Sequence, residues 1–231
     1  MELVGFQPLS LIDYPEKLSC IVWTLGCNFR CPFCYNADIV FGREENLHHV
    51  DEDEFFSFLE KRKRFLDGVV ITGGEPTLQS GLPEFIEKIK KRGFLAKLDT
   101  NGTHPEVLKA LLRRALIDYI AMDIKAPLKR YEELVNARVD QEQILESISL
   151  IKQAPKYEFR TTVIPNLIDV EDIEKISKLV GKGKYVLQQF EPKSTTIDPS
   201  YTDKEPYSEQ VLEEMCNIAK KHVQNCKIRG I

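Results

Sequence analysis

Residues 20–34 read CIVWTLGCNFRCPFC, and this stretch decides the fold class because it joins a strand directly to a group of cysteines. Residues 20–25 form a short apolar run with β-branched members, which is typical of a strand buried on both faces. The run leads into Cys27, Cys31 and Cys34, which are spaced as C-x3-C-x2-C. Thiols grouped so closely in a long chain indicate a metal or catalytic site rather than a disulfide framework.

The rest of the chain repeats the order of strand, turn and helix. We predict strands at 68–72, 94–99, 118–123, 157–163 and 185–190, with a short tail strand near 227–229. We predict helices at 51–63, 82–92, 105–115, 140–153, 169–180 and 207–222. About six strand–helix units in one run imply an α/β fold, in which helices cover a parallel sheet through right-handed crossovers.

Length and composition restrict the class of protein. The 231 residues suit one domain, which we divide into an extension at 1–18, a core at 19–191 and a carboxyl-terminal loop, helix and tail at 192–231. With 42% hydrophobic residues, 29% charged residues and a net charge of −4, the chain favours neither nucleic acid nor membrane lipid as a partner. We find no export signal and no apolar run near the ~18 residues of a membrane span, so we expect a cytoplasmic protein.

One long stretch, residues 192–206, is rich in Pro, Ser and Thr and has no strand or helix pattern. Long irregular segments inside compact domains often serve as lids or binding loops. A plain surface loop is the alternative.

Three thiolates in one loop can hold three corners of a cubane iron–sulfur cluster and leave its fourth iron without a protein ligand. Electron-transfer clusters normally have four cysteine ligands, so an open iron favours a cluster that binds a further molecule. One alternative is a zinc site completed by Cys20, His48 or His49. Another is a redox relay whose fourth ligand is Cys216 or Cys226. Outside these alternatives, we interpret Cys20, Cys216 and Cys226 as structural.

Polar residues and one pair of glycines gather where the predicted strands end. In chain order they are Gly73, Gly74, Glu75, Asp99, Asp123, Lys125, Arg160 and Gln189. The carboxyl ends of parallel strands meet at one edge of a sheet, which is where βα folds place their active sites. Packing alone does not explain polar groups at every strand end, so the pattern predicts an enzyme.

The cysteine loop and the segment Gly73-Gly74-Glu75-Pro76 together resemble the signature motifs of the radical S-adenosylmethionine (SAM) superfamily. Within that superfamily, the chain is most similar to the activating proteins of anaerobic ribonucleoside-triphosphate reductase, which are glycyl radical enzyme activases. The further similar stretches are 10–15 (SLIDYP), 99–102 (DTNG), 123–125 (DIK), Arg160 with 163–165 (VIP), and 188–190 (QQF). The resemblance covers roughly residues 1–191. Glu16 and Tyr35 depart from it, because many activases have Gly and His at these positions.

This resemblance implies a partial, open (β/α)6 barrel with parallel strands, a 4Fe–4S cluster and SAM as cofactors. It implies that Cys27, Cys31 and Cys34 bind the cluster and act in catalysis. The residues that it suggests for SAM binding are Phe33, Tyr35, Gly73, Gly74, Glu75, Asp99, Asp123, Ile124, Lys125, Arg160 and Gln189.

The chemistry of these side chains suits the implied cofactor. Asp123 and Lys125 are two residues apart on a strand and therefore share a face. A carboxylate can bind ribose hydroxyls, a lysine can bind the methionine carboxylate, and Arg160 has the fork geometry for a carboxylate. An internal ion-pair network that binds no ligand is the alternative for these residues. Of the adjacent Gln188 and Gln189, strand alternation lets only one face inward, and we expect it to be Gln189.

The resemblance also implies an activity. It implies an oxidoreductase that reductively cleaves SAM to a 5′-deoxyadenosyl radical and generates a glycyl radical on a partner enzyme, with anaerobic ribonucleotide reductase as the first candidate. A flavodoxin- or ferredoxin-like protein would donate the electron. The alternative in the same chemistry is a radical SAM enzyme for a small molecule, resembling 7-carboxy-7-deazaguanine synthases. The competing class is a non-catalytic iron–sulfur or zinc protein.

Overall fold

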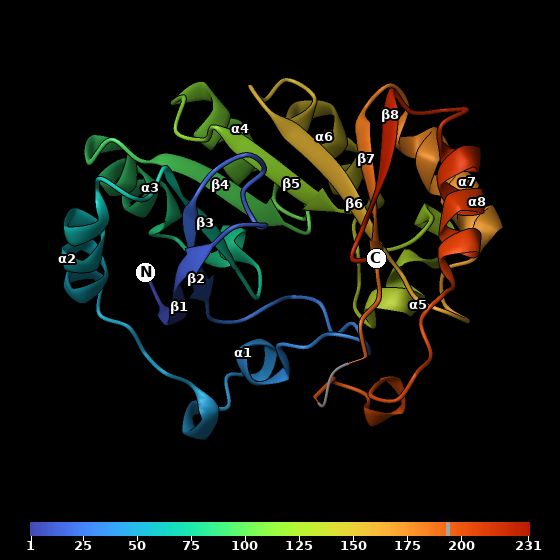
Figure 1. Cartoon of the computed structure of the whole chain (residues 1–231), viewed down its shortest axis with the longest axis horizontal. Coiled ribbons are helices and arrows are strands. Elements are labelled where there is room, and N and C mark those ends of the chain that lie inside the picture. The colour runs from blue at the N-terminus through green and yellow to red at the C-terminus, as the bar shows by residue number, and fades with distance from the viewer. Residues whose placement is uncertain (193–194) are drawn as a thin grey trace.

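The computed structural model describes residues 1–192 and 195–231, with Glu44 described by its backbone alone. Its centre is one eight-stranded sheet whose strands lie side by side in chain order (Figure 1). The strands are β1 (Leu3–Ser10), β2 (Ser19–Thr24), β3 (Gly68–Gly73), β4 (Leu95–Thr100), β5 (Tyr119–Asp123), β6 (Tyr157–Val163), β7 (Lys184–Gln189) and β8 (Asn225–Arg229). Strand β1 is antiparallel to β2, and every later neighbouring pair is parallel.

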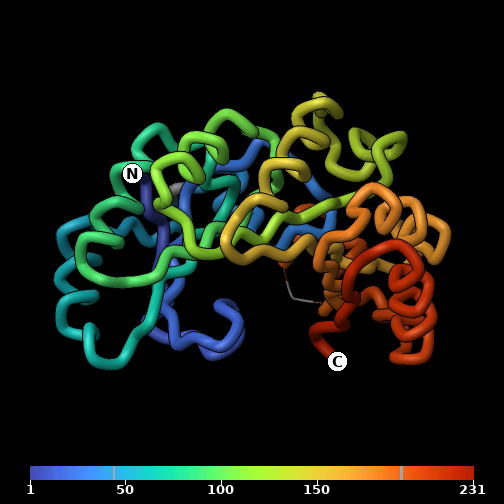
Figure 2. The backbone as a smooth tube through the Cα atoms, turned by 90° about the horizontal axis from the view of Figure 1, so that it is seen from above, coloured from blue at the N-terminus to red at the C-terminus, as the bar shows by residue number. Residues whose placement is uncertain are grey.

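Helices connect the parallel strands and pack on the outer side of the curved sheet, as Figure 2 shows from above. The long helices are α2 (Glu52–Arg62), α3 (Leu82–Lys91), α4 (Pro105–Arg113), α6 (Gln141–Ile151), α7 (Val170–Val180) and α8 (Glu209–Ala219). The short helices α1 (Ala37–Phe41) and α5 (Tyr131–Val135) lie in connections. In the described part of the chain, no helix has the length and apolar character needed to cross a membrane.

The sheet does not close into a full barrel. Strands β1 and β8 are its two edges and, among the described residues, do not pair with each other. In Figure 2 the loop that follows β1 and the carboxyl terminus lie on either side of the resulting opening. The fold is therefore the partial, open barrel with parallel strands that was predicted.

The six long helices and the central parallel strands confirm the predicted α/β pattern, with ends that differ by at most three residues. The exception is β1, which occupies much of the predicted extension at 1–18. Its burial pattern is irregular because it is an edge strand, and its register against β2 shifts twice. Gly5 and Pro8 also interrupt the run of strand-forming residues, so the sequence carries no regular strand signal there.

The contact between α2 and α3 offers a test of the core. Phe85 on α3 is 1% exposed, and its ring centroid lies 5.7 Å from that of Phe55 and 5.3 Å from that of Phe56. Phe85→Ala leaves a cavity between the helices, so the free energy of unfolding should fall by about 3–5 kcal/mol in urea titrations followed by circular dichroism. The matched control is Phe65→Ala, because Phe65 is 66% exposed. It should change stability by at most about 0.5 kcal/mol. Equal losses in the two variants would contradict this account of the core.

Candidate active site

A cavity of about 230 Å³ lies at the carboxyl ends of the central strands, beneath the loop that follows β2. Its wall contains 12 of the 14 residues that the sequence analysis proposed as site residues. Ile124 and Gln189 are the two that do not line it. Further lining residues include Phe29, Asn36, Thr72, Thr100, Asn101 and Thr162.

The loop that follows β2, residues 25–36, brings the three clustered cysteines to this cavity together with Phe33 and Tyr35. None of the three is in a disulfide, and Cys31 is buried while Cys27 and Cys34 are half-buried. Burial raises the pKa of Cys27 to about 11 and that of Cys31 to about 12, and it also raises the pKa of Cys34. In the described residues, no three His, Cys, Asp or Glu side chains converge as closely as the ligands of a single metal ion.

The Gly73-Gly74 turn at the end of β3 is held directly against this cysteine loop. The Gly74 amide donates to the Thr24 carbonyl at 3.0 Å, and the Glu75 amide donates to the Gly26 carbonyl at 2.8 Å. A Cβ on Gly74 would collide with the Gly26 carbonyl oxygen, and a Cβ on Gly73 would collide with the Thr24 backbone. Glycine is therefore required at both positions because the turn and the cysteine loop touch through their backbones.

Glu75 joins the glycine turn to the end of β4. Its carboxylate is 1% exposed and accepts from the Thr77 amide at 3.1 Å and the Thr77 hydroxyl at 2.5 Å. It also accepts from the Thr100 hydroxyl at 2.7 Å and the Asn101 amide at 2.6 Å. Burial raises the pKa of Glu75, although these donors oppose the shift. Most of its acceptor capacity is thus used within the protein, which limits what it can offer to a ligand.

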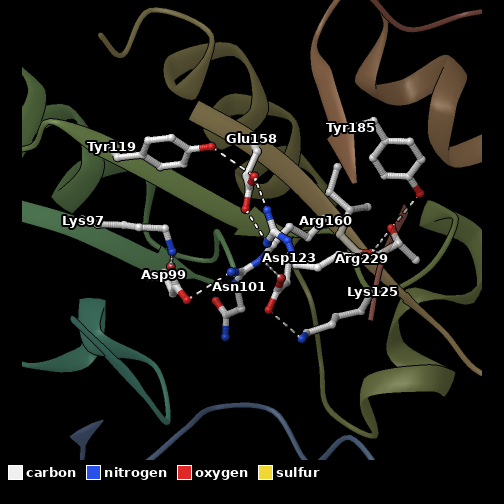
Figure 3. A network of polar contacts seen from close by, with 12 residues as sticks. Lys97, Asp99, Asn101, Tyr119, Asp123, Lys125, Glu158, Arg160, Tyr185 and Arg229 are labelled. Carbon is white, nitrogen blue, oxygen red and sulfur yellow. Dashed lines mark hydrogen bonds and ion pairs between the residues drawn. The ribbon is translucent and has the colours of Figure 1, made fainter. Parts of the chain in front are cut away.

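Charged side chains from three neighbouring strands meet below the cysteine loop, as Figure 3 shows. Arg160 on β6 is the centre, because it donates to Asp123 at 2.7 Å and to Asp99 at 3.1 Å. Lys125 pairs with Asp123 at 3.0 Å, and Lys97 pairs with Asp99. Three cations and two carboxylates thus form the network, and the Glu75 carboxylate lines the same cavity.

These contacts fix the ionisation of the network. Burial disfavours the charged form of Asp123, but the attraction of Arg160 and Lys125 outweighs it and holds the pKa of that carboxyl well below its usual range. Burial likewise opposes the charge on Lys125, but Asp123 and the neighbouring thiols raise its pKa. The ion-pair network considered from the sequence is therefore present. All of its members except Lys97 line the cavity, so the network does not exclude a role for these residues in ligand binding.

The structure places Ile124 and Gln189 away from the cavity. Ile124 is fully buried in the core, on the face opposite to its neighbours Asp123 and Lys125, as strand alternation requires. The register pairs Gln188 with Thr162, a lining residue, so Gln188 and not Gln189 shares the inner face. The Gln189 side chain instead donates to the Tyr207 carbonyl at 2.6 Å. The prediction that Gln189 faces inward was wrong. Strand alternation shows that only one of the two glutamines faces inward, but it does not show which one.

Sequence reasoning missed two contributors to the site. Lys97 is 1% exposed and holds Asp99 from the same strand. Its signal was available, because a lysine two residues before an inward carboxylate shares its face. The second contributor is the amide of Asn28, which donates to the Thr103 hydroxyl at 2.9 Å and accepts from Asn101 at 2.8 Å, so the cysteine loop is tied to the end of β4.

The residues present fit the cofactors that the resemblance implies. The donor set at the loop consists of sulfur alone, which suits an iron–sulfur cluster, and metal binding displaces thiol protons. The Lys125 ammonium beside it suits a ligand that carries a carboxylate, and the bound carboxylates suit hydroxyl and amino groups.

Comparison with known proteins agrees with this fit. The sequence model of the Radical SAM superfamily matches residues 21–180. A protein of Methanocaldococcus jannaschii that carries the provisional name of a glycyl-radical enzyme activating enzyme is 41% identical, over 98% of this chain and 95% of its own length. The pyruvate formate-lyase-activating enzyme of Staphylococcus aureus is 32% identical over 53% of this chain and 52% of its own.

Among solved structures, SuiB of Streptococcus suis in complex with its precursor peptide SuiA has a TM-score of 0.67 at 15% identity, over 91% of this chain and 48% of that chain. Identity this low shows a shared fold only. The family match, by contrast, spans the cysteine loop, the glycine turn and the charged strand ends that form the cavity. The chain therefore belongs to the radical SAM superfamily, whose enzymes use a 4Fe–4S cluster and SAM.

Proposed function

We propose that this chain is an activase that generates a glycyl radical in a partner enzyme. The observation that carries the proposal is the 41% identity to the Methanocaldococcus jannaschii activating enzyme, which extends over nearly the full length of both chains. The open side of the sheet supports it, because a segment of another protein can approach the cavity between β1 and β8.

Cys27, Cys31 and Cys34 are the proposed cluster ligands. When bound, the cluster and SAM supply a one-electron reductive cleavage that yields a 5′-deoxyadenosyl radical. The protein's part is to hold and orient. The Gly74 and Glu75 amides fix the cysteine loop to β2 and β3, and the ring of Phe33 packs the loop into the core.

Lys125 and Asp123 are the proposed contacts for SAM, and Arg160 acts through its contacts with the two aspartates. The Lys125 ammonium has three donors, of which Asp123 takes one, so the others are available to the methionine carboxylate. Each Asp123 oxygen accepts one hydrogen bond and keeps capacity for a ribose hydroxyl. Arg160 holds Asp99 and Asp123 at a fixed separation, so it is a positioning residue in this scheme.

A glycine-bearing backbone loop suits the approach to this cavity. Arg229 on β8 reaches Glu158 on β6 with two hydrogen bonds of 2.9 Å and, with Tyr119, occupies the inner face of the sheet (Figure 3). None of these three side chains lines the cavity, so they leave it to the partner's loop. Removing one hydrogen atom from glycine needs one cluster, and Cys20, Cys216 and Cys226 do not line the cavity.

Anaerobic ribonucleotide reductase is the proposed partner, on the motifs that resemble its activating proteins, and a flavodoxin- or ferredoxin-like protein is the proposed electron donor. A pyruvate formate-lyase-type partner and a small-molecule substrate are the alternatives that experiment must separate.

The cluster ligands are tested by iron content. Cys31→Ala should abolish reconstitution to about four irons per chain, because a cubane held by two thiolates is poorly retained. Cys20→Ala is the matched control, since Cys20 is fully buried in β2 and outside the cavity. It should keep the iron content of the wild type. Zinc in place of iron in the anaerobically reconstituted wild type would contradict the assignment.

The SAM contacts are tested by affinity. Asp123→Asn keeps the shape of the side chain but removes its charge, and SAM binding should weaken roughly ten- to a hundredfold, as for a lost hydrogen bond to a charged group. Iron content should stay unchanged. Asp118→Asn is the control, because Asp118 precedes the same strand at its opposite end. Equal SAM affinities in both variants by calorimetry would assign Asp123 to the internal network alone.

The activity itself is tested by electron paramagnetic resonance. Reconstituted protein, a reductant, SAM and anaerobic ribonucleotide reductase should give a glycyl radical signal whose hyperfine splitting disappears when the glycine Cα hydrogens are replaced by deuterium. SAM cleavage should be slow without the partner. A signal only with pyruvate formate-lyase would retain the activase and change its partner. Rapid SAM turnover with a small metabolite alone would overturn the activase function.

A further inference from the structure

Tyr35, which directly follows the third cysteine of the loop, binds a segment far along the chain. Its hydroxyl donates to the Glu191 carbonyl and accepts from the Glu191 amide at 3.1 Å. Its ring stacks on Phe190 with a centroid separation of 5.9 Å and an interplanar angle of 23°. One side chain thus fixes the cysteine loop to the residues that leave the end of β7.

A second set of contacts comes from the backbone of residues 195–201, which we call the strap. The Ile197 amide donates to the Cys34 carbonyl at 3.1 Å, and the Asp198 amide donates to the Pro32 carbonyl at 2.8 Å. The strap therefore pairs with the turn between the second and third cysteines, itself closed by the Cys34 amide on the Cys31 carbonyl at 3.0 Å. In Figure 1 the orange segment that includes the strap lies beside the blue cysteine loop.

The strap is anchored within the fold. The Asp198 side chain caps a short 3-10 helix at Pro199–Tyr201 by accepting from the Ser200 amide at 2.9 Å. Thr196 donates to the Asp198 carbonyl at 2.6 Å, and Tyr201 is 8% exposed within the main core cluster. The sequence suggested a lid or a surface loop at 192–206. These contacts show that its described part packs on the cysteine loop.

We propose that the strap and Tyr35 act together as a latch on the cysteine loop, and that this latch limits how fast the cluster is lost to species in solution. The proposal rests on the assignment of Cys27, Cys31 and Cys34 as cluster ligands. Its physical basis is that the loop's carbonyl groups at Pro32 and Cys34 are paired on one side while its thiols line the cavity. Loss of iron requires the loop to move away from the strands, and that movement breaks the latch contacts. Tyr35 is therefore a positioning residue.

The latch is tested anaerobically by chelator challenge of the reconstituted protein. The decay of the cluster's visible absorbance in excess EDTA measures cluster loss without any assay of activity. Tyr35→Phe removes the hydroxyl that binds Glu191, and Ile197→Pro removes the amide that binds Cys34. Each hydrogen bond contributes to holding the loop closed, so each variant should lose its cluster about three- to tenfold faster than the wild type.

The matched control is Tyr207→Phe, since the Tyr207 hydroxyl also donates to a backbone carbonyl, that of Ile168 at 3.0 Å, outside the cysteine loop. It should lose its cluster at the wild-type rate. Thermal unfolding of the metal-free proteins separates latch opening from general destabilisation. The proposal is overturned if Tyr35→Phe and Ile197→Pro decay at the wild-type rate, or if decay rates follow the unfolding midpoints in all three variants. A wild type that takes up no iron would instead overturn the ligand assignment.

Discussion

The contact between the glycine turn after β3 and the loop after β2 is the constraint on which the site depends. Because Gly74 lacks a Cβ, its backbone can touch that of Gly26. The amides of Gly74 and Glu75 also donate hydrogen bonds to the carbonyls of Thr24 and Gly26. Glu75 continues the chain of contacts to β4 through Thr100 and Asn101. The cysteine loop and the ends of the first three parallel strands are therefore one connected unit.

The charged network extends this unit across the sheet, and its composition favours function over stability. Burying charges has a large desolvation penalty, which ion pairing repays only in good geometry. Here both carboxylates of the network are paired, with Arg160 between Asp99 and Asp123. The Lys125 ammonium of this network is the group that we propose to bind the carboxylate of SAM.

Sequence reasoning succeeded where the environment imposes a regular pattern. The central strands are buried on both faces and the long helices are amphipathic, so both were found. Edge strand β1 has no such pattern. Site residues at strand ends were predictable because turns and motifs mark those ends. Lys97 was missed because one lysine inside a strand resembles a solvent-facing residue, although its spacing from Asp99 places both side chains on one face. Gln189 failed because the inward phase of β7 depends on its register with β6.

The unpaired edges of the sheet have a mechanical consequence. A closed barrel resists widening because any increase in its circumference breaks a ladder of interstrand hydrogen bonds. In this chain the seam between β1 and β8 has no ladder among the described residues, so no interstrand hydrogen bonds there resist a change in its width. The two sides of the seam are instead joined by the contacts of the latch, in which Tyr35 and the cysteine loop bind Glu191 and the strap. The width of the opening is therefore coupled to the position of the cysteine loop, because the same contacts hold both.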